Sequence, residues 1–318
     1  MRTSPRIHSQ KVLTYTIRRL LLLIPTLFFV ALIVFVLAKA APGSPFDRNE
    51  NRPLPQATID RLNEVYGFNK PIHEQFALYL GNAVRFDFGS SLVRNRPVAD
   101  IVAAQLPVSA QLGVQALLLA LAISLPLGVI SALKQNSGVD YVSLLLATIG
   151  TTIPSFVIAI VFIYIFAVNL KLVPIVGWAT PKHMILPTVI LALGPAAYLT
   201  RITRSSMLEA IRQDYVRTAR AKGLREQVVV VTHIMRNAMI PVVTVVGPAT
   251  AGLITGSFII ERIFSIPGIG REFILSIEKR DYPVIMGVYL LYAFIIAVAN
   301  LTVDLVYGML DPRIKVGK

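Results

Sequence analysis

The chain has 318 residues, of which 55% are hydrophobic and 15% charged, with a mean hydropathy of +0.66. Soluble domains carry about 25% charged residues, so this chain has too few to cover a water-exposed surface of its size. It contains no cysteine, which excludes disulfides, thiolate catalysis, iron–sulfur clusters and cysteine-ligated zinc. Its formal net charge of +14 raises a nucleic-acid hypothesis that the position of the basic residues has to decide.

Six stretches are long and apolar enough to cross a membrane, because a bilayer core about 30 Å thick needs roughly 20 apolar residues in a helix. The first follows Arg18 and Arg19 and so resembles a secretory signal. It has 19 residues, whereas signal cores have about 7–15, which favours a retained helix. The predicted spans are Leu20–Ala38, Leu112–Leu133, Tyr141–Val168, Met184–Thr203, Ile240–Ile260 and Val284–Leu310.

These spans predict an all-α integral membrane protein with six transmembrane helices. The predicted regions are a cytoplasmic N-terminus (1–19), the first transmembrane helix (20–38), an outer segment (39–105), and a core domain (106–318) that holds five helices and a cytoplasmic loop (204–239).

The basic residues predict the orientation of the chain. Segments on the side of the N-terminus hold 17 Lys and Arg, and the short loops on the other side hold 6. The segment 39–105 is left out, because loops beyond about 60 residues cross membranes largely regardless of charge. The prediction is N-in and C-in. The positive charge then faces anionic membrane lipid, and without interleaved aromatic residues no nucleic-acid partner is expected.

The outer segment is too polar to span and opens with the helix-breaking Pro42 and Pro45. Two short helices are expected in it, an amphipathic one at Ala57–Tyr66 and a second at about His73–Arg85. They suggest a cap that either touches an external partner or only covers the membrane part.

The long loop carries eight Lys and Arg between residues 201 and 239. Strong helix formers predict one helix at Leu208–Lys222, and Gly223 stands where a glycine closes a helix. Tyr215, Ala219 and Lys222 share a face, with Thr218 and Ala221 beside them. By itself this pattern fits either a helix that binds a partner closely or one that lies on the lipid surface.

Candidates inside the membrane are few. Asp304, with Asn300 one turn earlier, is the one carboxylate within a predicted span, and such a group is a candidate for the transport path or for a structural hydrogen bond. Gly252 and Gly256 have the spacing of a helix-packing motif. Prolines in the spans allow bends. They are Pro126, Pro154, Pro187, Pro195, Pro241 and Pro248.

The sequence contains no recognisable catalytic motif. The four histidines are scattered, and the sequence contains neither His-Glu-x-x-His nor Gly-x-Ser-x-Gly. It also lacks the Gly-x-x-x-x-Gly-Lys-Ser/Thr loop that binds nucleotide phosphates. We therefore expect no catalytic residue, metal or cofactor in this chain.

An ordered set of motifs gives the sequence a family resemblance. They are Asp214–Gly223 followed by His233-x-x-Arg236-Asn237-Ala238-x-x-Pro241, Asp87-Phe88-Gly89-x-Ser91, Glu261-x-x-Phe264-Ser265-x-Pro267-Gly268-Ile269-Gly270, Arg280-Asp281-Tyr282-Pro283 and Asp311-Pro312-Arg313. The set resembles the type I permease subunits of peptide-class ABC importers, in particular the "B" subunit of dipeptide and oligopeptide systems. The general family motif has Glu-Ala-Ala where this chain has Arg217-Thr218-Ala219, as is usual for the peptide subfamily.

The resemblance implies half of a translocation path in a bacterial or archaeal plasma (inner) membrane. It implies a second homologous permease, one or two ABC ATPase subunits that bind ATP and Mg²⁺, and an external binding protein as partners, besides membrane lipid. The loop helix would dock on an ATPase and couple it to the membrane helices, with closest approach at Ala219 and Gly223. The residues assigned to coupling are Asp214, Tyr215, Thr218, Ala219, Ala221, Lys222 and Gly223. The rival interpretation is a stand-alone proton-coupled transporter or channel that uses Asp304.

Overall fold

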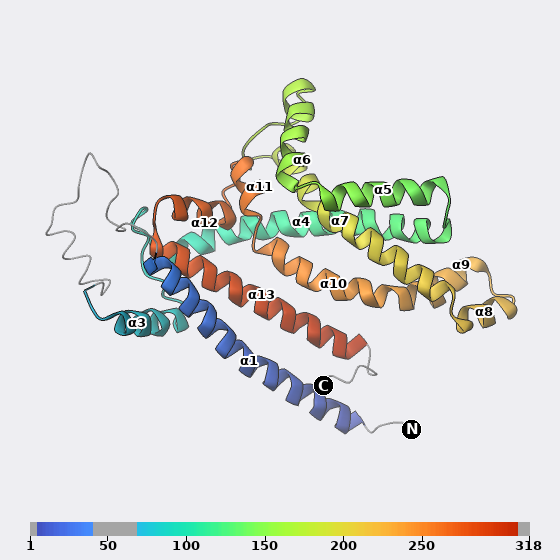
Figure 1. Cartoon of the computed structure of the whole chain (residues 1–318), viewed down its shortest axis with the longest axis horizontal. Helices are drawn as coiled ribbons and strands as arrows, with labels where there is room; N and C mark the ends of the chain where they lie inside the picture. Colours follow the sequence, from blue (N-terminus) through green and yellow to red (C-terminus); the bar gives the residue numbers. More distant parts are fainter. Residues whose placement is uncertain (1–4, 41–68, 311–318) are drawn as a thin grey trace.

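The computed structural model describes the backbone of residues 5–40 and 69–310, and the side chains of 17–40 and 69–302. The regular elements in this part of the chain are helices (Figure 1). They are α1 (Pro5–Ala40), α3 (Ile72–Val84), α4 (Val98–Leu133), α5 (Gly138–Thr152), α6 (Ser155–Phe162), α7 (Pro181–Ile211), α8 (Asp214–Ala221), α9 (Glu226–Val228), α10 (Arg236–Ile254), α11 (Phe258–Ile263), α12 (Ile269–Glu278) and α13 (Tyr282–Leu310), with π-helical segments at Ile163–Asn169 and Val229–Met235.

The molecule has two ends, here called the α8 end and the α12 end (Figure 1). The long helices α4, α7, α10 and α13 run between them. The start of α1 and the end of α13 lie toward the α8 end, whereas α3 and α12 lie at the other. This arrangement agrees with loop 204–239 and the outer segment being on opposite sides of a membrane. Which side faces the cytoplasm remains a prediction from the charges.

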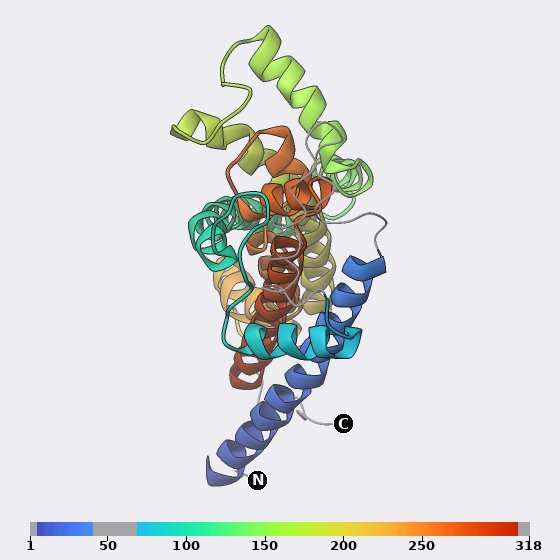
Figure 2. The same ribbon diagram turned by 90° about the vertical axis from the view of Figure 1, so that its left-hand side faces the viewer.

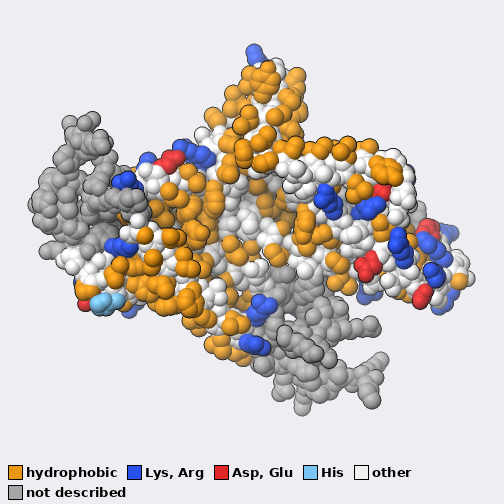
Figure 3. All heavy atoms as spheres, in the orientation of Figure 1, with side chains coloured by type: hydrophobic (Ala, Val, Ile, Leu, Met, Phe, Trp, Pro, Cys, Tyr) orange, Lys and Arg blue, Asp and Glu red, His pale blue; other side chains and the backbone are white. Residues whose placement is uncertain are grey.

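Five helical stretches among the described residues are long and apolar enough to cross a membrane. On the face drawn in Figure 3, hydrophobic side chains cover the middle of the molecule and Lys and Arg gather around α8 and α9. The five stretches are Ile17–Ala40, Val98–Leu133, Pro181–Ile211, Glu226–Ile263 and Tyr282–Thr302. The chain is therefore a multi-pass membrane protein.

The third predicted span, Tyr141–Val168, is sharply bent at Pro154, one of the prolines predicted to allow bends. The structure has α5 followed by α6 and its π-helical continuation, with a bend of 104° between them. Ile153 is extended (φ −83°, ψ 125°) because the ring of Pro154 disfavours a helical conformation in the preceding residue. The pair counts as a sixth span only if the bent unit as a whole crosses the membrane.

The remaining prolines predicted to bend the spans do not end their helices. α4 continues through Pro126, α7 through Pro187 and Pro195, and α10 through its own two prolines. Membrane helices tolerate proline where neighbouring helices satisfy the freed carbonyl groups.

Small residues let α4 and α7 pack closely. Ala116 and Ala120 on α4 form a buried cluster with Ala192 and Ala196 on α7. Lipid tails are as apolar as leucine, so close van der Waals contact rather than water exclusion holds such helices together. α5 and α10 pack against these two helices, whereas α1 packs against α13.

The predicted helix at His73–Arg85 is confirmed as α3, while the one at Ala57–Tyr66 lies outside the described residues. α3 crosses α1 (Figure 2). Phe76 on α3 lies against Phe28 and Phe35 on α1, with ring centroids 5.7 and 5.3 Å apart. Aromatic pairs at these separations are favourable, so they fix α3 on α1.

Candidate functional site

The candidate site is the α8 end, where α7 stops and α8 begins. The sequence predicts one helix at Leu208–Lys222, but the structure divides it between the end of α7 and α8. At the break the backbone N–H groups of Arg212 and Gln213 donate to Glu209 O and Ala210 O (3.3 and 3.2 Å), which tightens the last turn. Gln213 then has an extended backbone (φ −77°, ψ 149°) that redirects the chain into α8.

Gly223 ends α8 as the sequence predicts. Its φ is +71°, in the left-handed region that favours glycine. Its N–H donates to Arg220 O (2.9 Å), and the N–H of Leu224 donates to Ala219 O (3.4 Å), which satisfies carbonyls at the helix end. A Cβ on Gly223 would meet nothing within 4 Å, so glycine is needed here for its backbone conformation and not for space within this chain.

The inner face of α8 is buried in its own chain. Val216 is 0% exposed and Ala219 5% exposed, and both pack into one apolar cluster. The other buried members of the cluster are Ala132 at the end of α4, Met207 and Ala210 on α7, Val229 and Ile234 in the π-helical segment, and Ala238 on α10. α8 is thereby fixed to the ends of three long helices. Ala219, predicted as a point of closest approach to a partner, instead contacts this chain.

The outer face of α8 carries the other residues assigned to coupling. Asp214, Tyr215, Thr218, Ala221, Lys222 and Gly223 are all exposed. At the edge of this face Arg220 pairs with Glu226 of α9 (Nη2–Oε1 2.6 Å), and the carboxylate raises the pKa of the guanidinium. This ion pair joins α8 to α9. The apolar cluster on the inner face and this ion pair at the edge together fix the position of α8.

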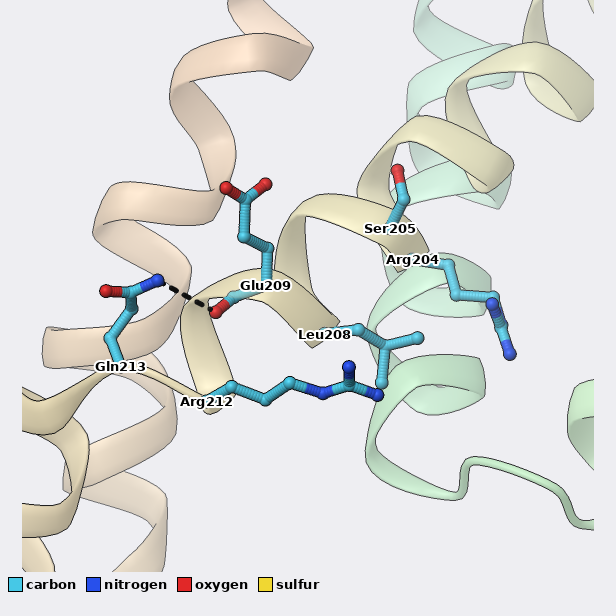
Figure 4. Close-up of a pocket in the computed structure, with 6 residues that line it drawn as sticks. All are labelled: Arg204, Ser205, Leu208, Glu209, Arg212 and Gln213. Carbon is cyan, nitrogen blue, oxygen red and sulfur yellow. Dashed lines mark hydrogen bonds between the residues drawn. The ribbon is translucent and has the colours of Figure 1, made fainter.

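An open pocket of about 380 Å³ adjoins this surface (Figure 4). Six residues of α7 and the break line it, namely Arg204, Ser205, Leu208, Glu209, Arg212 and Gln213. The amide of Gln213 donates to Glu209 O (3.5 Å) across one side of it. The lining mixes both charges with an apolar side chain, which suits a protein surface better than a small apolar ligand. No group of three His, Asp or Glu side chains in the described part of the chain is placed to hold a metal ion.

The predicted intramembrane candidates are not brought together with α8. Asn300 is exposed on α13, and the side chain of Asp304 lies outside the described residues. Gly252 and Gly256 do not pack two helices of this chain together, and packing against a second permease subunit stays a prediction. Gly252 is exposed with open space around it, and Gly256 lies beyond the end of α10 with φ +91°, where a Cβ would clash with Glu261.

Asp140 and Glu261 are buried carboxylates to which sequence reasoning assigned no role, although Glu261 opens one of the family motifs. Asp140 lies in the first turn of α5 and pairs with Arg204, and Glu261 lies at the α12 end on α11. The signal for Asp140 was the pattern Ser137-x-x-Asp140 before an apolar run, which is typical of a helix start. The signal for Glu261 was its position at the start of the motif that ends in Gly268-Ile269-Gly270.

Comparison with known proteins identifies a family and several relatives of this chain. The family model described as "Binding-protein-dependent transport system inner membrane component" matches residues 124–316. The chain is 46% identical over 305 residues to the dipeptide transport system permease protein DppB of Bacillus subtilis strain 168, with 96% of this chain and 98% of that protein covered.

Two further relatives carry other substrate names. The oligopeptide transport system permease protein AppB of Bacillus subtilis strain 168 is 41% identical over 312 residues, with 95% of this chain and 99% of AppB covered. The glutathione transport system permease protein GsiC of Escherichia coli K12 is 38% identical over 304 residues, with 96% and 99% covered. The chain therefore belongs to the family of inner membrane components of binding-protein-dependent transport systems, as a multi-pass permease subunit of an ABC importer.

Proposed function

We propose that this chain is one of two membrane subunits of an ATP-driven importer of short peptides. The observation that carries the proposal is the 46% identity to DppB, which extends over almost the whole of both chains. The relatives AppB and GsiC are named for oligopeptides and glutathione. Their common chemistry is a short peptide, and the proposal goes no further than that class.

In this proposal the exposed face of α8 docks on a cytoplasmic ATPase subunit, which binds ATP and Mg²⁺. When two ATPase subunits close on ATP, they would move α8. Because Val216 and Ala219 anchor α8 in the cluster at the ends of α4, α7 and α10, the movement would reach these helices directly. Hydrolysis would reverse it. The peptide path would run along the interface with a second, homologous permease, and an external binding protein would deliver the peptide.

Uptake of a labelled dipeptide tests the proposal. Deleting the gene in the native host is expected to lower uptake at least tenfold, and a plasmid copy should restore it, while uptake of a labelled free amino acid stays unchanged. Depleting ATP with the proton gradient maintained should abolish uptake. A protonophore with ATP maintained should leave it intact. The opposite energy dependence would favour the proton-coupled rival and overturn the proposal.

A further inference from the structure

Asp140 is a carboxylate at the α8 end whose hydrogen-bonding capacity is fully used. It is 1% exposed. Oδ1 accepts from Ser131 Oγ and from Arg204 Nε (2.6 Å), and Oδ2 accepts from the Asn136 N–H (2.9 Å) and from Arg204 Nη2 (2.8 Å). An ionised carboxylate has about four acceptor sites, and here each one has a donor. The geometry with Arg204 is the bidentate one that gives the greatest directional specificity.

The donors come from different elements. Ser131 is on α4, Asn136 is in the turn before α5, and Arg204 is on α7, one residue beyond the predicted end of that span at Thr203. The network therefore joins three helices at one point. Arg204 also lines the open pocket at the end of α7, next to the start of α8.

Apart from Asp140, the buried part of the contact between α5 and α7 is made by small side chains. Asp140, Ser143 and Ala147 are buried at helical spacing on α5, and one turn further a Cβ on Gly150 would lie 2.8 Å from Ala197 Cβ on α7. A face of small residues brings two helices close but offers little to stop one from sliding along the other. Asp140 is the one charged member of this face, and it fixes the position of α5 along α7.

α5 has no buried residue in the apolar cluster that anchors α8 among the described residues. The cluster ties α8 to α4, α7 and α10 only. A movement of α8 thus reaches α5, and through the 104° bend also α6, by way of the ends of α4 and α7, and Asp140 contacts both through Ser131 and Arg204.

We propose that Arg204 and Asp140 are positioning residues for coupling: they make α5 follow the end of α7 when a partner moves α8. The inference rests on the proposed function. Without the pair, α7 would move and α5 would lag, so ATP would be hydrolysed with less transport.

The test uses the whole importer, purified with its companion subunits and placed in liposomes with its binding protein and a labelled dipeptide. Asp140→Asn keeps the side-chain shape and removes the charge. The expected result is a fall of about tenfold in dipeptide transported per ATP hydrolysed, within the usual range of coupling effects, with basal ATPase activity per complex within about twofold of wild type. A merely structural role would lower the yield of complex without changing this ratio.

Arg201→Gln is the matched control. Arg201 lies three residues before Arg204 and joins the same two helices through an exposed hydrogen bond from Nη2 to Thr148 Oγ1 (2.7 Å). It should leave the ratio unchanged. An unchanged ratio in Asp140→Asn, or an equal fall in Arg201→Gln, would overturn the proposal.

A second variant covers the case in which Asp140→Asn does not assemble because it leaves the Arg204 cation unpaired. Asp140→Asn/Arg204→Gln buries no unpaired charge and should show the same tenfold fall. Wild-type coupling in the double variant, or its failure to assemble, would overturn the proposal. A wild-type preparation without ATPase subunits would instead contradict the proposed function, and the inference with it.

Discussion

Replacing Gly223 with valine is expected to lower ATP-dependent transport more than tenfold while the chain still inserts in the membrane. Gly223 has φ +71°, a left-handed conformation that costs an ordinary residue about 1–2 kcal/mol and a β-branched one more. The substituted chain would relieve this strain by changing the path from α8 into α9. α8 would then present its outer face at a different angle to a partner.

Two control variants separate backbone conformation from other effects. Gly223→Asn places a side chain of similar size at the same position, but asparagine tolerates the left-handed region, so transport should stay within about threefold of wild type. Gly138→Ala changes a helical glycine that also has open space around it and should have no effect. Equal losses in the Val and Asn variants would contradict the backbone explanation. Wild-type transport in Gly223→Val would contradict the coupling role of this segment.

Replacing Gly268 with alanine is expected to destabilise the α12 end by about 1–3 kcal/mol, the usual range for overpacking. Its Cβ would clash with Glu261 Oε2 and Ser109 Oγ. Glu261 is 0% exposed and accepts from the Arg271 N–H (3.0 Å), and Ser109 Oγ accepts from the Ile269 N–H (2.9 Å). These N–H groups belong to the first turn of α12, so the clash would disturb the residues that cap this helix.

The thermal midpoint of the purified protein measures this effect. Trp178 is the single tryptophan and packs against the apolar cluster that contains Phe264, so its fluorescence reports on this region. The double variant Gly268→Ala/Glu261→Ala should be less destabilised than the sum of its single variants, because the smaller side chain makes room for the new methyl group. Additive losses would show that Gly268 is not required to accommodate the carboxylate.

Much of the fold follows from the sequence because lipid imposes simple rules. Apolar length predicts the helices that span, and a polar stretch between helix breakers predicts α3. The 104° bend does not follow, because several prolines interrupt apolar runs and only Pro154 ends its helix. Whether proline breaks a membrane helix depends on neighbours that satisfy the freed carbonyl, and one sequence does not reveal which helices are neighbours.

Part of the candidate site could also be predicted from the sequence. Gly223 could be recognised as a helix terminator because a left-handed residue is a local property. Which face of α8 is buried could not, since alanines lie on both faces and Ala219 contacts the chain itself while Ala221 is exposed. The pair between Asp140 and Arg204 joins residues 64 positions apart, and only the packing of α5 against α7 brings them together.

The most direct test of the account is site-specific cross-linking from the exposed face of α8. The chain has no cysteine, so Thr218→Cys introduces one thiol at a defined place. With a thiol-reactive cross-linker in native membranes, we expect a product with an ABC ATPase subunit. Phe86→Cys, which is 61% exposed near α3 on the predicted outer side, should give none. An ATPase product from Phe86→Cys, or only self-cross-linked chains from Thr218→Cys, would contradict the claim that α8 is the coupling surface.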